Sequence, residues 1–153
     1  MMRRLALVIL IALLAMPRSA SAQQSYHPAC FNAARTQADM TTCAGDSYKV
    51  VDSILQVAVQ ERRDSLGGAR RAQFDSAQSA WSAYATIECQ FQASYFRDGT
   101  MMSMQELFCR GQLGTARLQA LVRSLCDETR AQQASCPAAR RYELPASLAD
   151  PGS

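Results

Sequence analysis

The sequence lacks most of the features that identify an enzyme or a metalloprotein. It contains one histidine, His27, and no two cysteines in a C-x-x-C pair. Thioredoxin-like redox centres and zinc fingers use such pairs, and c-type haem attachment adds a histidine directly after one. A Ser-His-Asp or Cys-His site needs a histidine held by packing and by a third group, whereas His27 lies in a polar segment. We therefore expect no catalytic residue, no metal site and no cofactor.

Apolar runs long enough to cross a membrane are also missing. The longest apolar run, residues 5–16, follows two arginines and precedes small residues at positions 20–22. This order predicts a signal peptide over residues 1–22, cut between Ala22 and Gln23, because the run is too short for a transmembrane helix. No cysteine follows the run directly, so we expect no lipid anchor. The mature protein is therefore predicted to be periplasmic or secreted, with no membrane anchor.

An excess of charge of either sign is absent once the signal peptide is removed. The whole chain carries a net charge of +3, from 16 basic and 13 acidic residues. Arg3, Arg4 and Arg18 leave with the signal peptide and no acidic residue does, so the mature chain is neutral. A neutral chain gives no reason to expect nucleic acid or an anionic membrane as a partner.

Cysteine is what the mature chain does contain. An even number of cysteines in an exported chain predicts a disulfide framework, which leaves no thiol as a nucleophile. All six cysteines follow the predicted cleavage site: Cys30, Cys43, Cys89, Cys109, Cys126 and Cys136.

Apolar residues recur at spacings of three and four over three long segments, which predicts three helices. The first begins with a capping box, in which the Thr36 hydroxyl and the Asp39 carboxylate satisfy backbone N–H groups of the first turn. No alternating strand pattern exceeds a few residues. The fold class is therefore all-α, an antiparallel bundle of three or four helices stapled by disulfides. The predicted helices cover about residues 36–66, 69–96 and 103–125.

The remaining segments flank this helical domain, which covers residues 36–126. Residues 23–35 are polar and are predicted to form an extended arm. Residues 127–153 are rich in alanine, proline and arginine and show no sustained period. They are predicted to form a loop pinned by a Cys126–Cys136 bridge, followed by a disordered tail.

Separations from the predicted turns indicate which cysteines lie at the same height in the bundle. Cys43 and Cys89 are nearly equidistant from the first turn, and Cys89 and Cys109 are equidistant from the second. Cys30 lies just before the first helix, at the same end. Two pairings stay open: Cys43–Cys89 with Cys30–Cys109 is the first choice, and Cys30–Cys43 with Cys89–Cys109 is the second. Each bridge contributes about 2–4 kcal/mol.

Several stretches within this framework resemble one known family. They are "CFNAARTQADMTTCAGDSY" from Cys30, "VDSILQ", "AQSAWSAYATIEC" ending at Cys89, and "LGTARLQAL" after Cys109. Over residues 30–125 this ordered set is similar to the LprI-type lysozyme inhibitor family. The resemblance implies a small helical, disulfide-linked domain, periplasmic or secreted, whose named activity is inhibition of lysozyme.

Charged and aromatic residues on the predicted helix faces are assigned structural roles. Trp81 and Tyr84 share a face with apolar residues and are expected in the core, with a ligand groove as the alternative. Glu88 is expected to form an ion pair with Arg117 of the third helix, and Asp52 is the other candidate partner of Arg117. A catalytic carboxylate would need a second titrating group, and none can be placed.

Two clusters have a functional alternative beside their structural interpretation. Methionines at positions 101, 102 and 104 are interpreted as packing at a helix start, with Cu(I) binding as the alternative because thioethers bind Cu(I). Four arginines around the first turn are interpreted as a solvated turn, with contact to an anionic envelope surface as the alternative. These arginines are Arg62, Arg63, Arg70 and Arg71.

Two functions are compatible with these features. The first is a binding protein that inhibits lysozyme, an enzyme that cleaves its substrate between two carboxyl groups. An exposed, rigid loop with hydrogen-bond donors suits such a cleft, and the loop nearest the predicted disulfides contains Arg97 and Asp98, our candidate binding residues. The alternative is a structural or interaction protein of the bacterial envelope, which contacts its partner through the arginines or through residues 127–153.

Overall fold

The structure is a computed structural model that describes residues 28–97, 99–128 and 136–143. Every regular element in these residues is a helix, which confirms the predicted all-α class. The predicted signal peptide, Asp98 and most of the predicted tail lie outside the described residues. The elements are α2 (Pro28–Ala33), α3 (Gln37–Asp64), α4 (Gly68–Ala93), the 3₁₀ helix η1 (Ser94–Phe96), α5 (Met102–Glu128) and α6 (Pro137–Arg141).

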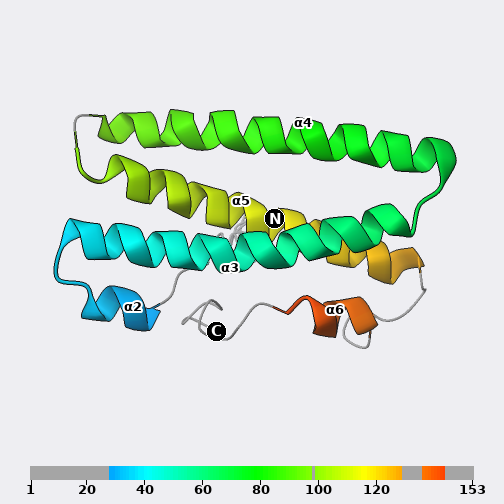
Figure 1. Ribbon diagram of the computed structural model, residues 1–153, viewed down its shortest axis with the longest axis horizontal. Coiled ribbons are helices and arrows are strands. Elements are labelled where there is room, and N and C mark those ends of the chain that lie inside the picture. The colour runs from blue at the N-terminus through cyan, green and yellow to red at the C-terminus, as the bar shows by residue number, and fades with distance from the viewer. Residues whose placement is uncertain (1–27, 98, 129–135, 144–153) are drawn as a thin grey trace, which may run out of the picture.

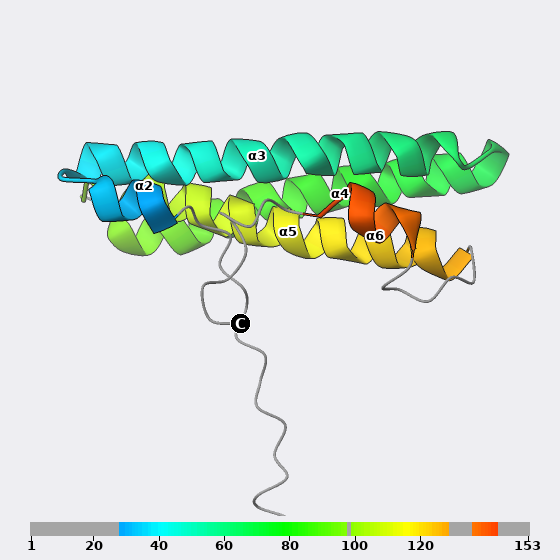
Figure 2. The same ribbon diagram turned by 90° about the horizontal axis from the view of Figure 1, so that it is seen from below.

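The three long helices α3, α4 and α5 run side by side along the long axis of the molecule (Figure 1). α3 packs closely against α5, whereas α4 packs mainly against α5 and only sparsely against α3. The two short helices lie at opposite ends of the bundle, as Figures 1 and 2 both show. Of the helices in the described ranges, none is sufficiently long and apolar to cross a membrane.

The close contact between α3 and α5 depends on a glycine of α5. A Cβ atom on Gly114 would lie 3.0 Å from Cγ1 of Val51, which is closer than ordinary van der Waals contact. Val51 is fully buried, and the core continues along both helices through Leu55, Leu118 and Leu121. Among the described helices, α3 and α5 have the most extensive contact, and burial of these apolar side chains stabilises the fold.

The start of α3 confirms the predicted capping box. The backbone N–H of Asp39 donates to Oγ1 of Thr36 at 3.1 Å, and the N–H of Thr36 donates to Oδ2 of Asp39 at 2.9 Å. The N–H of Arg35 donates to the same carboxylate oxygen at 3.0 Å. These donors, Arg35 first, hold the pKa of Asp39 below its usual value. The cap fixes where α3 begins, directly after the turn that follows α2.

The prediction of an extended arm is wrong for residues 28–33, which form α2. A helix of six residues is too short to be stable alone, so its tertiary contacts must hold it. Cys30 is bonded to Cys43 of α3, and the ring of Phe31 stacks on that of Phe108 of α5 with centroids 5.3 Å apart. α2 therefore folds back against the bundle instead of extending away from it.

The prediction for the segment after α5 also needs correction. The expected Cys126–Cys136 bridge is present, with Cα atoms 5.6 Å apart, but residues 137–141 form the helix α6. Tyr142 is buried against the core, its hydroxyl donates to Glu61 of α3, and Arg141 forms an ion pair with Glu61 at 2.9 Å. The hydrogen bond from Tyr142 is the main reason why the pKa of Glu61 lies below its usual value. This segment is therefore part of the fold.

The first-choice disulfide pairing is wrong, and the second choice is confirmed. The bonds are Cys30–Cys43 and Cys89–Cys109, with Cα–Cα distances of 5.7 and 5.4 Å. The four cysteines do lie at one end, but height along the bundle does not decide the partner. α4 packs mainly on α5 and only sparsely on α3, so Cys89 meets Cys109, while α2 brings Cys30 to Cys43.

Candidate functional site

The contact between α4 and α5 is organised around Arg117. Its Nε and Nη2 atoms donate to Oε1 of Gln78 at 3.0 and 2.9 Å, and its guanidinium lies 5.9 Å from the centre of the Trp81 ring. Burial lowers the pKa of Arg117. This arrangement supports the alignment of α4 on α5 with a cation–π contact and two hydrogen bonds, and it has no acid or base poised for chemistry.

The predicted ion pairs of Arg117 with Glu88 or Asp52 are not formed. Glu88 accepts a hydrogen bond from Gln92 at 2.7 Å, and Asp52 accepts one from Gln56 at 2.6 Å, each within its own helix. In an antiparallel pair, residues at equal separations from the connecting turn lie level. Counted from that turn, Arg117 is level with Trp81 and not with Glu88, which is why it reaches Gln78 instead.

The outward face of α4 is the most apolar exposed surface among the described residues. The side chains of Tyr84, Ile87 and Phe91, and that of Tyr95 in the following helix η1, are 54%, 67%, 57% and 75% exposed. The expectation that Tyr84 lies in the core is wrong, and Trp81 is half-buried. α4 buries its opposite face, through Ala85, Cys89 and Ala93, against α5.

The connection between α4 and α5, which we call the tip (residues 94–97 and 99–102), projects this surface to the end of the bundle (Figure 1). The N–H of Arg97 donates to the carbonyl of Ser94 at 3.1 Å, and that of Gly99 donates to the carbonyl of Phe96 at 3.0 Å, so the turn is internally bonded. The Arg97 side chain is exposed and has no ion-pair partner among the described residues. The tip therefore presents a cation beside two backbone hydrogen bonds; the other candidate, Asp98, lies outside the described residues.

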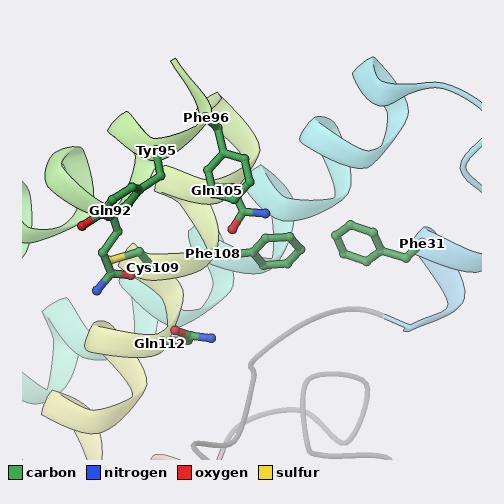
Figure 3. A pocket seen from close by; sticks show the side chains of 8 residues that line it. All are labelled: Phe31, Gln92, Tyr95, Phe96, Gln105, Phe108, Cys109 and Gln112. Carbon is green, nitrogen blue, oxygen red and sulfur yellow. The ribbon is translucent and has the colours of Figure 1, made fainter. Parts of the chain in front are cut away.

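A groove of about 600 Å³ opens beside the tip, between α2, α4 and α5 (Figure 3). Phe31 enters it from one side and Tyr95 and Phe96 from the other, with the Phe108 ring between them. The lining contains no charged side chain, so the groove offers aromatic faces and carboxamide groups, which suit binding and not acid–base catalysis. Its lining residues are Phe31, Gln92, Tyr95, Phe96, Gln105, Phe108, Cys109 and Gln112.

The methionines near the tip do not share one environment. Met104 is buried, and its sulfur accepts a hydrogen bond from Nε2 of Gln37 at 3.4 Å, whereas Met101 and Met102 are exposed. Met104 thus fills a packing position, as the structural interpretation holds. No cluster of His, Cys, Asp and Glu side chains capable of holding a metal ion occurs in the described ranges, and His27 lies outside them.

The arginine-rich turn between α3 and α4 uses its charges within the hairpin. Arg63 pairs with Asp75 at 3.0 Å, and Arg71 pairs with Asp64 at 3.2 Å. Arg62 is buried, and its Nη1 atom donates to Oγ of Ser65 at 3.5 Å. Because Asp75 and Asp64 compensate the charges of Arg63 and Arg71, the turn gives less support to an anionic envelope contact than the tip gives to protein binding.

The sequence indicates the tip as a candidate but not the α4 surface or the part of α2 in the groove. Phe31 lies in the segment that is predicted to be an extended arm, and the sequence pattern gives no role to Ile87, Phe91 and Tyr95. One signal does mark this surface: between Ser76 and Phe96 the only charged residue is Glu88, although the helix has an exposed face.

Comparison with known proteins agrees with this picture of a binding protein. Residues 30–121 match one protein family, described as "Lysozyme inhibitor LprI". The match spans α2, α3, α4, the tip and most of α5, and it includes the cysteines of two of the three disulfides. No curated protein and no solved structure matches the chain.

Proposed function

Because the chain belongs to the LprI lysozyme inhibitor family, we propose that it is an exported protein that binds a lysozyme and inhibits it. The three disulfides support export, since such bonds persist in oxidising compartments. In this proposal the signal peptide is cut between Ala22 and Gln23, and the mature protein is periplasmic or secreted with no membrane anchor and no nucleic-acid partner. It acts by non-covalent binding, without a catalytic step or a cofactor.

The observation that carries the proposal is the tip, where an exposed arginine directly follows two aromatic residues, Tyr95 and Phe96, on a hydrogen-bonded turn. Lysozyme cleaves glycosidic bonds between two carboxyl groups that face each other in a cleft. The guanidinium of Arg97 has five donors in a planar fork that matches a carboxylate. A projecting tip that carries Arg97 therefore suits such a cleft in both shape and charge.

The bracing of the tip reduces the entropy lost on binding. The Cys89–Cys109 bond joins α4 to α5 close to the tip, and the backbone hydrogen bonds of the turn fix its geometry before any partner arrives. A loop held in its bound conformation gives higher affinity because less freedom is lost on association. The mature chain is neutral, so affinity depends on these contacts and little on long-range steering.

The test is a muramidase assay with the oxidised mature protein, residues 23–153, against lysozymes of several types. We expect the protein to inhibit at least one type of lysozyme at a concentration at or below about 10 µM. We expect Arg97→Ala to weaken inhibition by about tenfold or more, because the carboxylates of the cleft lose a charged hydrogen-bonding partner. Cell-wall hydrolysis and direct binding are measured with the same samples.

The matched control is Arg123→Ala, which removes an exposed arginine of α5 far from the tip and should leave inhibition unchanged. Lack of inhibition by the unaltered protein across all lysozyme types would refute the proposed function. Equal inhibition by the protein and its Arg97→Ala variant would keep the function and exclude Arg97 as the binding residue.

A further inference from the structure

The exposed face of α4 carries a repeat that α4 does not use within its own bundle. Its members alternate at spacings of three and four, which is the seven-residue pattern of a two-helix seam. All of them are exposed or half-buried, and the buried residues of α4 lie on the opposite face. We call this set the outer stripe; it consists of Ala77, Ala80, Tyr84, Ile87 and Phe91 of α4 and of Ser94, the first residue of η1.

We propose that the outer stripe of α4 joins two copies of this chain in an antiparallel, two-fold symmetric dimer. In an antiparallel pair of helices, each residue at the first position of the seven-residue repeat packs opposite a residue at the fourth position of the other helix. One register pairs all six members of the stripe: Tyr84 with Ile87, Ala80 with Phe91, and Ala77 with Ser94, each across the two-fold axis. The pairing is self-complementary, as a two-fold interface requires.

The sizes of the side chains favour this orientation. The small residues Ala77 and Ala80 lie at one end of the stripe, and the large residues Tyr84, Ile87 and Phe91 lie towards the other. In the antiparallel pair the Phe91 ring faces Ala80, so a large side chain fills the space beside a small one. A parallel pair would set Phe91 against Phe91 and alanine against alanine, which crowds one end and leaves space at the other.

The charges also permit two copies to meet. Glu88 is the only charged residue between positions 76 and 96; it lies at the edge of the stripe and accepts a hydrogen bond from Gln92. A second copy therefore brings no charge into the centre of the seam. A partner of strongly acidic or basic character would find no complementary group there.

The exposed area is sufficient for a dimer. The four large exposed side chains on this face, including Tyr95 at its edge, leave roughly 500 Å² uncovered per chain, from their exposed fractions and usual sizes. Two such faces give about 1,000 Å², near the lower limit for a specific interface before the flanking polar residues are counted. An apolar patch of this size is within the range of the largest patch on a protein surface, and such a patch is often a site of interaction.

The experiment measures the mass of the oxidised mature protein in solution by light scattering during gel filtration and by sedimentation, over a range of concentrations. We expect a dimer for the unaltered chain. Ile87→Glu should weaken dimerisation by about 30-fold or more, the usual loss for a central interface residue. Val57→Glu is the matched control, since Val57 of α3 is apolar and 60% exposed but lies outside the stripe, so this variant should remain dimeric.

A charge-pair variant tests the register and the orientation. Tyr84→Lys alone should also give monomers, whereas Tyr84→Lys combined with Ile87→Glu should restore the dimer, because the antiparallel register places the new lysine opposite the new glutamate. Helical circular dichroism and intact disulfides show that each variant is folded. A monomeric unaltered chain at all concentrations, or a dimer that survives Ile87→Glu, would overturn the proposal. Failure of the double variant to dimerise would overturn the antiparallel register.

Discussion

α3 and α4 have almost the same length but are packed in different ways. α3 has 28 residues and buries seven of them, whereas α4 has 26 residues and buries only three. α3 lies close against α5 and also contacts α2 and, through Glu61, the α6 segment. α4 is held by α5 on one face and by the Cys89–Cys109 bond. The stability of the fold therefore resides mainly in α3 and α5, and α4 with the tip provides the exposed surface that is available to partners.

Truncation of one side chain in each helix interface tests whether the α3–α5 interface contributes more to stability than the α4–α5 interface. Leu118→Ala removes a buried residue from the core between α3 and α5 and should lower the free energy of unfolding by about 2–5 kcal/mol. Trp81→Ala removes a larger side chain from α4, but Trp81 is only half-buried, so we expect a smaller loss. Urea denaturation of both variants checks the order, and a larger loss for Trp81→Ala would contradict it.

Removal of the bond between α4 and α5 should affect α4 more than α3. The double variant Cys89→Ala/Cys109→Ala opens a loop with a sequence separation of 20 and should cost about 3 kcal/mol. Hydrogen exchange followed by mass spectrometry should show faster exchange in α4 and the tip, while α3 and its partner region of α5 keep their protection. Uniform loss of protection across all three helices would show that α4 is not the less stable element.

Two glycine substitutions distinguish the effect of close helix packing on stability from the effect of helix propensity. Gly114→Ala places a Cβ atom 3.0 Å from Val51, so overpacking should destabilise the protein by about 1–3 kcal/mol despite the better helix propensity of alanine. Gly45→Ala is the control, because its Cβ would lie 3.7 Å from Cδ1 of Leu107, an ordinary contact. Gly45→Ala should stabilise the protein by up to about 1 kcal/mol. Thermal unfolding measures both effects, and a change in melting temperature of the same sign for both variants would contradict the close packing at Gly114.

The smallest expected effect concerns the attachment of α6. The pKa of Glu61 lies below its ordinary value of 4.5 in the folded protein, so its contribution to stability is fully present above that value and is lost as the pH falls through the folded-state pKa. Protection of residues 137–143 from hydrogen exchange, corrected for intrinsic rates, should therefore fall as the pH is lowered below 4.5, before the protection of α3 and α5 falls. Tyr142→Phe should move this loss to higher pH, and an unchanged profile would contradict the role of the Tyr142–Glu61 bond.

Local features of the fold could be predicted from the sequence because their causes are local. The spacing of apolar residues places the three long helices, and Thr36 with Asp39 marks the start of α3. The choice of neighbours could not be predicted in this way. It depends on whether α4 packs on α3 or α5, which decides both the partner of Cys89 and the contact of Arg117 with Gln78.

The short helices escaped prediction because their own sequences are insufficient to stabilise them. α2 depends on the Cys30–Cys43 bond and on Phe108, and α6 depends on the Cys126–Cys136 bond and the burial of Tyr142. Each does begin with a proline, Pro28 and Pro137, a residue that is common in the first turn of a helix. The candidate site also combines a local and a tertiary feature. The turn at the tip can be predicted from the sequence, whereas the exposed face of α4 depends on which side of the helix α5 covers.

Hydrogen exchange of the oxidised mature protein, with and without a lysozyme that it inhibits, shows directly whether the bundle presents a binding surface on α4 and the tip. We expect new protection in peptides that cover residues 94–102, with α3 and the α6 segment unchanged. Protection confined to the arginine-rich turn or to the α6 segment, with residues 94–102 unaffected, would contradict it.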